Sequence, residues 1–303
     1  MTTLSQIQTL IETGNAENIK LAFQLGRSQN IPKKDIYKPW KKLVTFFRRQ
    51  RISGILKAKT SEEKILALFS RKVFILDVTS DADYHPQTER PPILNITLDH
   101  LTPAFWKLCN LKALHLGEAY LEELPAEVKQ LKNLEDFSLY ACRLKRLPKE
   151  LVELKNLKSL NLTHNNLKSI PANIDKLVNL EDLNLGHNKI NVFPEGILKL
   201  TKLKKLKLDA NSFKEFPLGL SNLENLEHFS YSSNKLKVLP ESITKLKKLK
   251  KLDLSSNELE TIPLSLAELP DLERINLSRN KLSSDQKKQI RERFQYCTIW
   301  GVS

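Results

Sequence analysis

Histidines provide the arrangement in this sequence that comes nearest to a chemical site. His164 and His187 lie 23 residues apart, which is also the period of a repeat in this chain, so their rings are expected to approach each other on adjacent units. A zinc site needs at least a third ligand drawn from His, Cys, Asp or Glu, and Asp209 is the nearest candidate by register. We predict no metal site and no cofactor, and we interpret these histidines as part of a polar binding face.

Nucleophilic chemistry has less support. The three cysteines, Cys109, Cys142 and Cys297, lie far apart, and none has a convincing neighbouring base that would activate its thiol. The sequence contains no glycine-rich phosphate loop, His-Glu metal motif or nucleophile elbow. We therefore predict that the chain is not an enzyme and has no small-molecule substrate.

Composition predicts a protein of the cytoplasm. Secreted repeat proteins usually close their ends with cysteine-rich caps, and the three scattered cysteines cannot form such caps. No run of about 18 apolar residues is present, so no membrane span is expected. Residues 1–20 lack a basic start followed by an apolar core, so no secretory signal is expected.

A 23-residue period positions most of the polar candidates. Leucine recurs at this spacing at Leu108, Leu131, Leu154, Leu177, Leu200, Leu223, Leu246 and Leu269. Proline recurs in step at Pro125, Pro148, Pro171, Pro194, Pro217, Pro240 and Pro263. Asparagine joins at Asn165, Asn188, Asn211, Asn234, Asn257 and Asn280. A period of this length predicts a solenoid in which each unit packs on its neighbours.

Residues 154–176 illustrate one unit. Leu160 and Leu162 alternate with polar residues as in a short strand with one buried face, so Ser159 and Asn161 are expected to point outward. Asn165 follows where the chain must turn, and a buried amide there can satisfy backbone groups that the turn leaves unpaired. Stacked units then place these amides in a ladder along the solenoid.

The pattern LxxLxxLxLxxNxLxxLPxxIxxL resembles the leucine-rich repeat family over about residues 93–303. It is most similar to the 23-residue class of intracellular Ras-suppressor-like, plant Ras-group-related and bacterial cytoplasmic proteins. The resemblance implies an α/β fold: a right-handed, curved solenoid with a parallel sheet on its concave face. It also implies that this face binds a protein. Ala119 and Cys142 depart from the pattern by replacing the first two asparagines.

The boundaries of the pattern divide the chain into four predicted parts. These are a helical N-terminal domain (1–72), N-terminal strands with a partial repeat (73–107), eight repeats of which the last is truncated (108–282), and a helix-strand cap (283–303). Ser283 and Gln286 are placed as a capping box for the helix of that cap. Within the N-terminal parts we expect helices over 3–12, 16–27 and 61–70, strands over 73–78 and 93–98, and a polar loop between the strands.

A basic amphipathic helix is expected within residues 33–51. The segment contains eight Lys/Arg and one acidic residue, and the whole chain has a net charge of +14. Pro39 suits a first helical position, so the regular helix is expected to begin near it. The segment is interpreted first as a domain helix with a buried aromatic face. The alternative is contact with nucleic acid or an anionic membrane through the basic side chains Lys38, Lys41, Lys42, Arg48, Arg49 and Arg51.

Two rows of outward positions should cross the concave sheet. The first alternates in sign without exception: Lys112, Glu135, Lys158, Glu181, Lys204, Glu227, Lys250 and Glu273. Neighbouring strands lie about 4.8 Å apart, so these charges can pair across repeats. The second row changes from acidic to basic along the chain: Ala113, Asp136, Ser159, Asp182, Lys205, His228, Lys251 and Arg274. This change of sign could orient a partner of complementary charge.

From these rows we predict a monomeric scaffold whose concave face binds an as yet unidentified protein. The predicted binding residues are His115, Asp136, Tyr140, His164, Asp182, His187, Lys205, Lys207, His228, Lys251 and Arg274.

Overall fold

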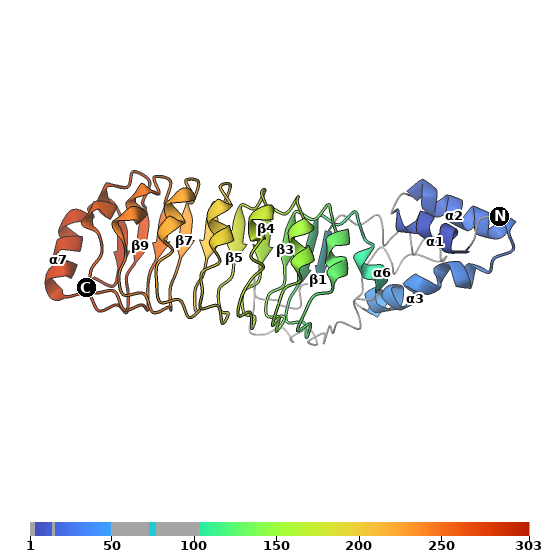
Figure 1. Cartoon of the computed structure of the whole chain (residues 1–303), viewed down its shortest axis with the longest axis horizontal. Helices are drawn as coiled ribbons and strands as arrows, with labels where there is room; N and C mark the ends of the chain where they lie inside the picture. The colour runs from blue at the N-terminus through green and yellow to red at the C-terminus, as the bar shows by residue number, and fades with distance from the viewer. Residues whose placement is uncertain (1–3, 14–15, 50–72, 77–102, 303) are drawn as a thin grey trace, which may run out of the picture.

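The computed structural model describes residues 4–13, 16–49, 73–76 and 103–302. Ten strands form one parallel sheet in chain order, as Figure 1 shows along its long axis. The first two strands and the last are β1 (Val73–Leu76), β2 (Ala113–Leu116) and β10 (Thr298–Trp300). The strands between them are β3 (Asp136–Ser138), β4 (Ser159–Asn161), β5 (Asp182–Asn184), β6 (Lys205–Lys207), β7 (His228–Ser230), β8 (Lys251–Asp253) and β9 (Arg274–Asn276). The predicted solenoid with a parallel sheet is confirmed.

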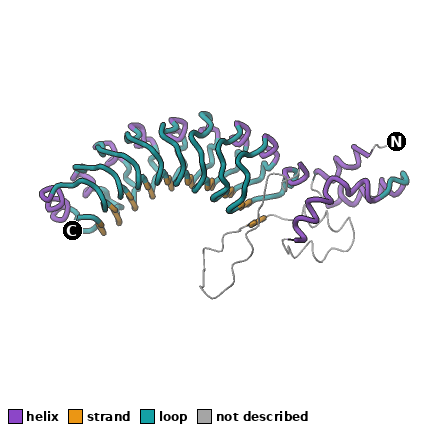
Figure 2. Tube along the Cα trace, turned by 90° about the horizontal axis from the view of Figure 1, so that it is seen from below, coloured by secondary structure: helices purple, strands orange, loops and turns teal. Residues whose placement is uncertain are grey.

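A short 3-10 helix follows each strand from β2 to β8. These helices are η2 (Ala126–Gln130), η3 (Lys149–Glu153), η4 (Ile174–Lys176), η5 (Glu195–Lys199), η6 (Leu218–Asn222), η7 (Glu241–Lys245) and η8 (Leu264–Glu268). Figure 2 shows the strands along the inner edge of an arc and the helices along its outer edge. Neighbouring strands lie about 4.8 Å apart, which is closer than helical turns can pack, so the sheet curves and its strands line the concave face.

Leucine fills the space between the two edges. The middle residue of each strand points inward, and strand pairing sets it beside its counterpart in the next unit, as with Leu160 and Leu183. Both side chains are at most 1% exposed. Burying one leucine contributes about 1.5–3 kcal/mol, and the same contact recurs in every unit. The flanking strand residues point the other way and form the concave surface.

A ladder of buried asparagine amides ties each unit to the one before it. The Asn188 Oδ1 accepts a hydrogen bond from the backbone N–H of Leu167 at 3.0 Å. Its Nδ2 donates to the carbonyl oxygens of Leu162 at 3.0 Å and Leu185 at 3.0 Å. The equivalent bonds recur at Asn165, Asn211, Asn234, Asn257 and Asn280. The expected role of these asparagines is confirmed.

The first two units lack this amide. Cys142 stands at the second asparagine position and its Sγ donates to the carbonyl oxygen of Leu116 at 3.0 Å. Burial raises the pKa of this thiol to about 12, so it stays protonated and can act as that donor. Ala119 has no polar side chain and simply packs in the core. Cys142 is thus a structural thiol.

A helix and a strand close the far end. Ser283 caps the N-terminus of α7 (Ser284–Arg293), and its side chain accepts a hydrogen bond from the Gln286 backbone N–H at 3.1 Å. Ile290 and Phe294 are buried against the last repeat. β10 then pairs with β9, so the expected helix-strand arrangement is present.

The helices described within residues 4–49 are α1 (Leu4–Glu12), α2 (Ala16–Ser28) and α3 (Lys33–Arg49). The prediction that the third helix begins near Pro39 is wrong, because α3 already begins at Lys33. Proline lacks the N–H that would bond to the carbonyl of Asp35. The Gln8 side chain of α1 donates to that carbonyl at 3.1 Å instead, so the helix tolerates the proline in its interior.

Contacts with α6 (Pro103–Trp106) and the residues after it join these helices to the repeats. Lys107 forms an ion pair with Glu12 of α1. β1 pairs with β2 from a point 40 residues earlier in the chain, so the regular period does not extend to the first strand. The expected helix 61–70, strand 93–98 and polar loop lie outside the described residues, and the four-part division remains a prediction. No helix among the described residues is long and apolar enough to cross a membrane.

Candidate functional site

Polar side chains in the N-terminal half of the concave face pair with one another. The His115 Nε2 lies 2.8 Å from the Asp136 Oδ2, and this contact is the main cause that lowers the pKa of Asp136. Two repeats after Asp136, the Asp182 Oδ2 lies 3.7 Å from the Lys205 Nζ. Four of the predicted binding residues therefore already have partners of complementary character within the protein.

Three rings form a ladder beside these pairs. His164 and His187 stack with centroids 4.0 Å apart, and Tyr140 meets His164 edge-on at 5.3 Å. Both histidines have a positive φ, 57° and 52°, at the turn before the ladder asparagines. Burial, followed by the charge of its neighbour, lowers the pKa of His164. The expected approach of the two histidines is confirmed.

Asp209 does not complete a metal site with this pair. Its Oδ1 accepts hydrogen bonds from the hydroxyl of Ser230 and from the backbone N–H of Ser232 at 3.1 Å. Among the described residues, no three His, Cys, Asp or Glu side chains gather in a way that could hold a metal ion.

The C-terminal half of the concave face forms a hollow of about 590 Å³, named here the basin. Predicted binding residues that line it are His187, Lys207, His228, Lys251 and Arg274. The basin also includes Asp209, Phe229, Ser230, Ser232, Leu252, Asp253, Asn276 and Trp300. Tyr140, His164 and the two early pairs lie outside it, so the structure brings together only part of the predicted set.

Three cations of the basin have no carboxylate partner among the residues that the structure describes. Within the described part of the chain, Lys207, Lys251 and Arg274 form no ion pair. The two local carboxylates are held by other groups. Asp209 is bound by serines, and Asp253 accepts from the backbone N–H of Ser255 at 2.9 Å.

The electrostatic effect of these cations appears at His228. Burial is the main cause that lowers the pKa of its imidazole, and the charges of Lys251 and Lys205 lower this pKa further. A neutral imidazole surrounded by ammonium groups indicates a positive local field. The basin is thus suited to an anionic group.

Trp300 is the residue of the basin that sequence reasoning missed. It ends β10, pairs with Asn276 of β9 and is 46% exposed. The cap helix interrupts the 23-residue period, so counting by repeats never reached this position. The strand predicted after the cap helix could have indicated Trp300, because the outward residues of that strand continue the rows of the sheet.

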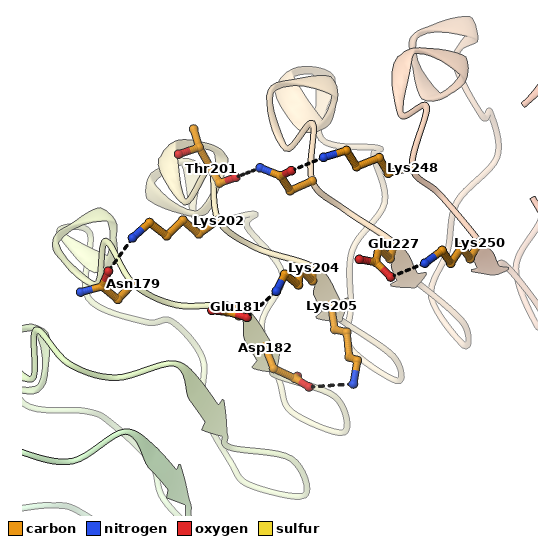
Figure 3. A network of polar contacts seen from close by, with 11 residues as sticks. Asn179, Glu181, Asp182, Thr201, Lys202, Lys204, Lys205, Glu227, Lys248 and Lys250 are labelled. Carbon is orange, nitrogen blue, oxygen red and sulfur yellow. Dashed lines mark hydrogen bonds and ion pairs between the residues drawn. The ribbon is translucent and has the colours of Figure 1, made fainter. Parts of the chain in front are cut away.

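The first outward row has a different arrangement. Glu135 lies 2.8 Å from Lys112 and 2.7 Å from Lys158, and these two lysines lower its pKa to about 2. Figure 3 shows the next pairs, Glu181 with Lys204 and Glu227 with Lys250, beside the Asp182–Lys205 contact of the second row. Their regular spacing indicates a role in stacking.

The basic helix is partly described. Ile36, Trp40 and Val44 of α3 are buried. This agrees with the interpretation of the segment as a domain helix with a buried apolar face. Lys38 and Lys41 are exposed. The side chains of Lys42, Arg48 and Arg49 and the whole of Arg51 lie outside the described set.

Comparison with known proteins agrees with this geometry. A family model described as leucine-rich repeat region matches residues 150–237, and a second, described as leucine rich repeat, matches residues 224–282. This chain is a leucine-rich repeat protein. A search of curated proteins finds no match.

Several solved leucine-rich repeat structures are similar to this one. A leucine-rich repeat protein of Leptospira interrogans is 33% identical, with 65% of this chain and 62% of that chain covered and a TM-score of 0.45. The ectodomain of the receptor kinase GASSHO1 from Arabidopsis thaliana, solved with CASPARIAN STRIP INTEGRITY FACTOR 2, is 30% identical, with 59% and 22% covered and a TM-score of 0.54. An internalin from Listeria monocytogenes is 22% identical, with 65% and 63% covered and a TM-score of 0.54.

The chain spans less than two thirds of the length of each of these proteins. The GASSHO1 ectodomain and the internalin share the leucine-rich repeat fold with the sheet and helices of this chain. The factor bound in the GASSHO1 structure is a partner of that protein.

Proposed function

We propose that this leucine-rich repeat protein is a non-enzymatic scaffold that binds a protein partner on its concave face. The observation that carries the proposal is the basin, where Lys207, Lys251 and Arg274 face solvent and have no carboxylate partner among the described residues. A charge left without a partner on a folded surface is available for an intermolecular contact. The partner segment is therefore acidic.

Trp300 gives this segment an apolar anchor. Tryptophan and arginine are the residue types that most often dominate binding energy at protein interfaces. Trp300 and Arg274 lie on neighbouring strands of the same hollow, so one partner segment can reach both. The bound factor in the GASSHO1 structure supports the idea that a repeat array of this kind accommodates a ligand.

The shape of the face favours a chain lying across the strands. Ser230 and Ser232 of one repeat line the basin, and Ser255 follows in the next repeat. These short side chains leave room for a backbone to come close. The open sheet gathers no three residues of the described set for metal chemistry, and the thiols have raised pKa values, so no activated nucleophile supports an enzyme.

Quantitative affinity capture from a lysate of the source cells tests this assignment. Immobilised wild-type protein is compared with the double variant Lys251→Glu, Arg274→Glu. We expect the specific partner to be lost from the double variant, because two attractive contacts become repulsive.

The matched control reverses two lysines on the outer rim. Lys202 and Lys248 each donate to an asparagine side chain of the preceding repeat at 2.7 Å (Figure 3). The variant Lys202→Glu, Lys248→Glu changes net charge equally, and it should retain the partner. Equal capture by both variants would show that the basin is not the binding site.

Contact of α3 with nucleic acid or an anionic membrane is the second candidate. Lys38 and Lys41 are exposed on this helix, while its apolar face is buried within the N-terminal helices. Burial of the face that would enter a bilayer argues for phosphate contact over insertion. A salt titration against DNA, RNA and anionic vesicles tests this candidate, since phosphate binding weakens steeply with salt.

A further inference from the structure

A second groove lies away from the basin, between two successive connections that lead from a strand to a 3-10 helix. One connection runs from β6 to η6 and the other from β7 to η7. The groove has a volume of about 710 Å³ and shares no residue with the basin. We name it the flank groove, and it is lined by Lys214, Glu215, Phe216, Leu218, Lys235, Leu236, Lys237, Val238, Pro240 and Glu258.

The apolar lining of the flank groove is unusually accessible. Leu218 is 80% exposed and Val238 is 69% exposed, and the buried side chains of Phe216 and Leu236 line the same groove. Phe216 is held edge-on against Phe229 of the core with centroids 6.0 Å apart. The groove therefore has a fixed apolar floor and two apolar walls that nothing in the described chain covers.

The repeat pattern does not require these apolar walls. Two residues before the proline, the first repeats place Glu123 and Arg146, which pair with each other. Two later units have valine at this position, Val192 and Val238, and only Val238 lines the flank groove. Stacking is thus compatible with charged residues at this position, and what distinguishes Val238 is its place beside Leu218 in the groove lining. Exposed apolar surface rimmed by polar residues is typical of interaction sites.

The rim of the flank groove favours carboxylates. Lys214, Lys235 and Lys237 are exposed and form no ion pair within the described ranges. Of the two glutamates in the lining, Glu258 is already bound by Lys281 at 2.9 Å. Lys281 chiefly lowers the pKa of Glu258, and Lys237 and Lys235 add to the effect. The unpaired cations thus outnumber the available acids.

We infer that the flank groove binds a short acidic segment of a second protein, with one bulky apolar side chain seated between Leu218 and Val238. Carboxylates on either side of that side chain would pair with Lys214, Lys235 and Lys237. Together with the basin, the groove would let one solenoid hold two partners at once.

Selection of short random peptides displayed on phage against the whole chain tests this inference. Peptides that bind wild type but not the Leu218→Ser variant are collected and sequenced. We expect them to combine a bulky apolar residue with flanking Asp or Glu. A synthetic copy of the leading peptide should bind both Leu218→Ser and Val238→Ser at least about tenfold more weakly than wild type.

Two further variants make the outcome specific. Val178→Ser removes another exposed apolar side chain, 58% exposed and outside the groove, and should leave the peptide affinity unchanged. Lys235→Gln with Lys237→Gln should weaken binding without touching the apolar walls. Thermal melts confirm that these surface variants fold.

Three results would overturn the inference. One is the absence of any Leu218-dependent peptide. Another is a set of Leu218-dependent peptides without an excess of acids. The third is Leu218-dependent binding to phosphatidylserine vesicles with no peptide selected, which would assign the groove to a membrane surface.

Discussion

Two rows of charged residues run side by side across the concave sheet, and they are neutralised in different ways. In the first row, Glu181 and Glu227 each lie within 2.8 Å of a lysine from the next repeat. In the second row, Lys251 and Arg274 have no such partner within the described chain. Asp253, a basin residue outside both rows, is held by the Ser255 backbone and the Asn276 amide. The difference separates residues that help repeats stack from residues left available to a ligand.

In this solenoid, side chains that follow the 23-residue period are therefore less available to a ligand than side chains that depart from it. A side chain that repeats every 23 residues meets an equivalent neighbour and can be satisfied within the protein. A side chain that departs from the period loses that neighbour, and its charge or apolar surface remains open. Both the basin and the flank groove are made of such departures.

The largest expected effect breaks the stacking on which both rows depend. Asn188→Ala removes the acceptor for the Leu167 N–H and the donor for the Leu162 and Leu185 carbonyls. Unsatisfied buried polar groups are costly, so we expect a loss of about 3 kcal/mol in the free energy of unfolding. Urea denaturation followed by circular dichroism measures it.

Asn173→Ala is the matched control for that substitution. Asn173 lies just before η4 and its side chain makes no capping hydrogen bond. Its replacement should change the free energy of unfolding by less than about 0.5 kcal/mol. Similar losses in both variants would mean that the amide ladder is not what holds adjacent repeats together.

Replacement of Trp300 tests whether the basin binds the partner. Trp300→Ala should weaken partner binding about tenfold, because an exposed aromatic anchor of the basin is removed. Stability should change little, since Trp300 is at the end of the sheet and 46% exposed. Tyr296→Ala, at a 98% exposed site outside the basin, is the control. Calorimetry with the captured partner distinguishes them, and equal affinities would remove Trp300 from the site.

Features governed by the repeat could be predicted from the sequence. The alternation around Leu160 and the asparagine at position 165 follow from local rules, and neighbouring units supply the same environment each time. Pro39 shows where such rules stop, because a side chain from another helix, Gln8, satisfies the carbonyl that the proline leaves open.

The candidate site was harder to predict for the same physical reason. Lys207 and Asp209 lie two positions apart in the sequence, a spacing that does not say whether their charges meet. The fold directs Asp209 to Ser230 and Ser232, and Lys207 forms no ion pair within the described residues. Whether a charged side chain is available to a ligand depends on which groups contact it in the folded protein. Those contacts can be read only from the three-dimensional structure.

The pH dependence of partner affinity tests whether the basin is positively charged and binds an acidic partner. His228 has a lowered pKa because burial and then Lys251 and Lys205 disfavour its charged form. An acidic partner would favour that form, so binding would raise the pKa and take up a proton. Affinity should therefore increase as pH falls from 7.5 through the ordinary histidine range towards 5.5, by about threefold. Calorimetry should find no such increase with His228→Gln, and an increase that persists there would assign the proton to another group.

The smallest expected effect concerns the first row alone. Lys112 and Lys158 lower the pKa of Glu135 to about 2, so the ion pairs stabilise the fold above the ordinary glutamate range and lose this contribution as pH falls towards 2. Glu135→Gln should thus lower the Tm slightly at pH 7, with a difference that shrinks at acidic pH and at high salt, because the pairs are exposed and screened. Differential scanning calorimetry across pH measures it, with partner affinity as the second readout. If Glu135→Gln weakened the partner as much as Lys251→Glu with Arg274→Glu does, the first row would belong to the binding surface, and stacking alone would no longer explain its alternation.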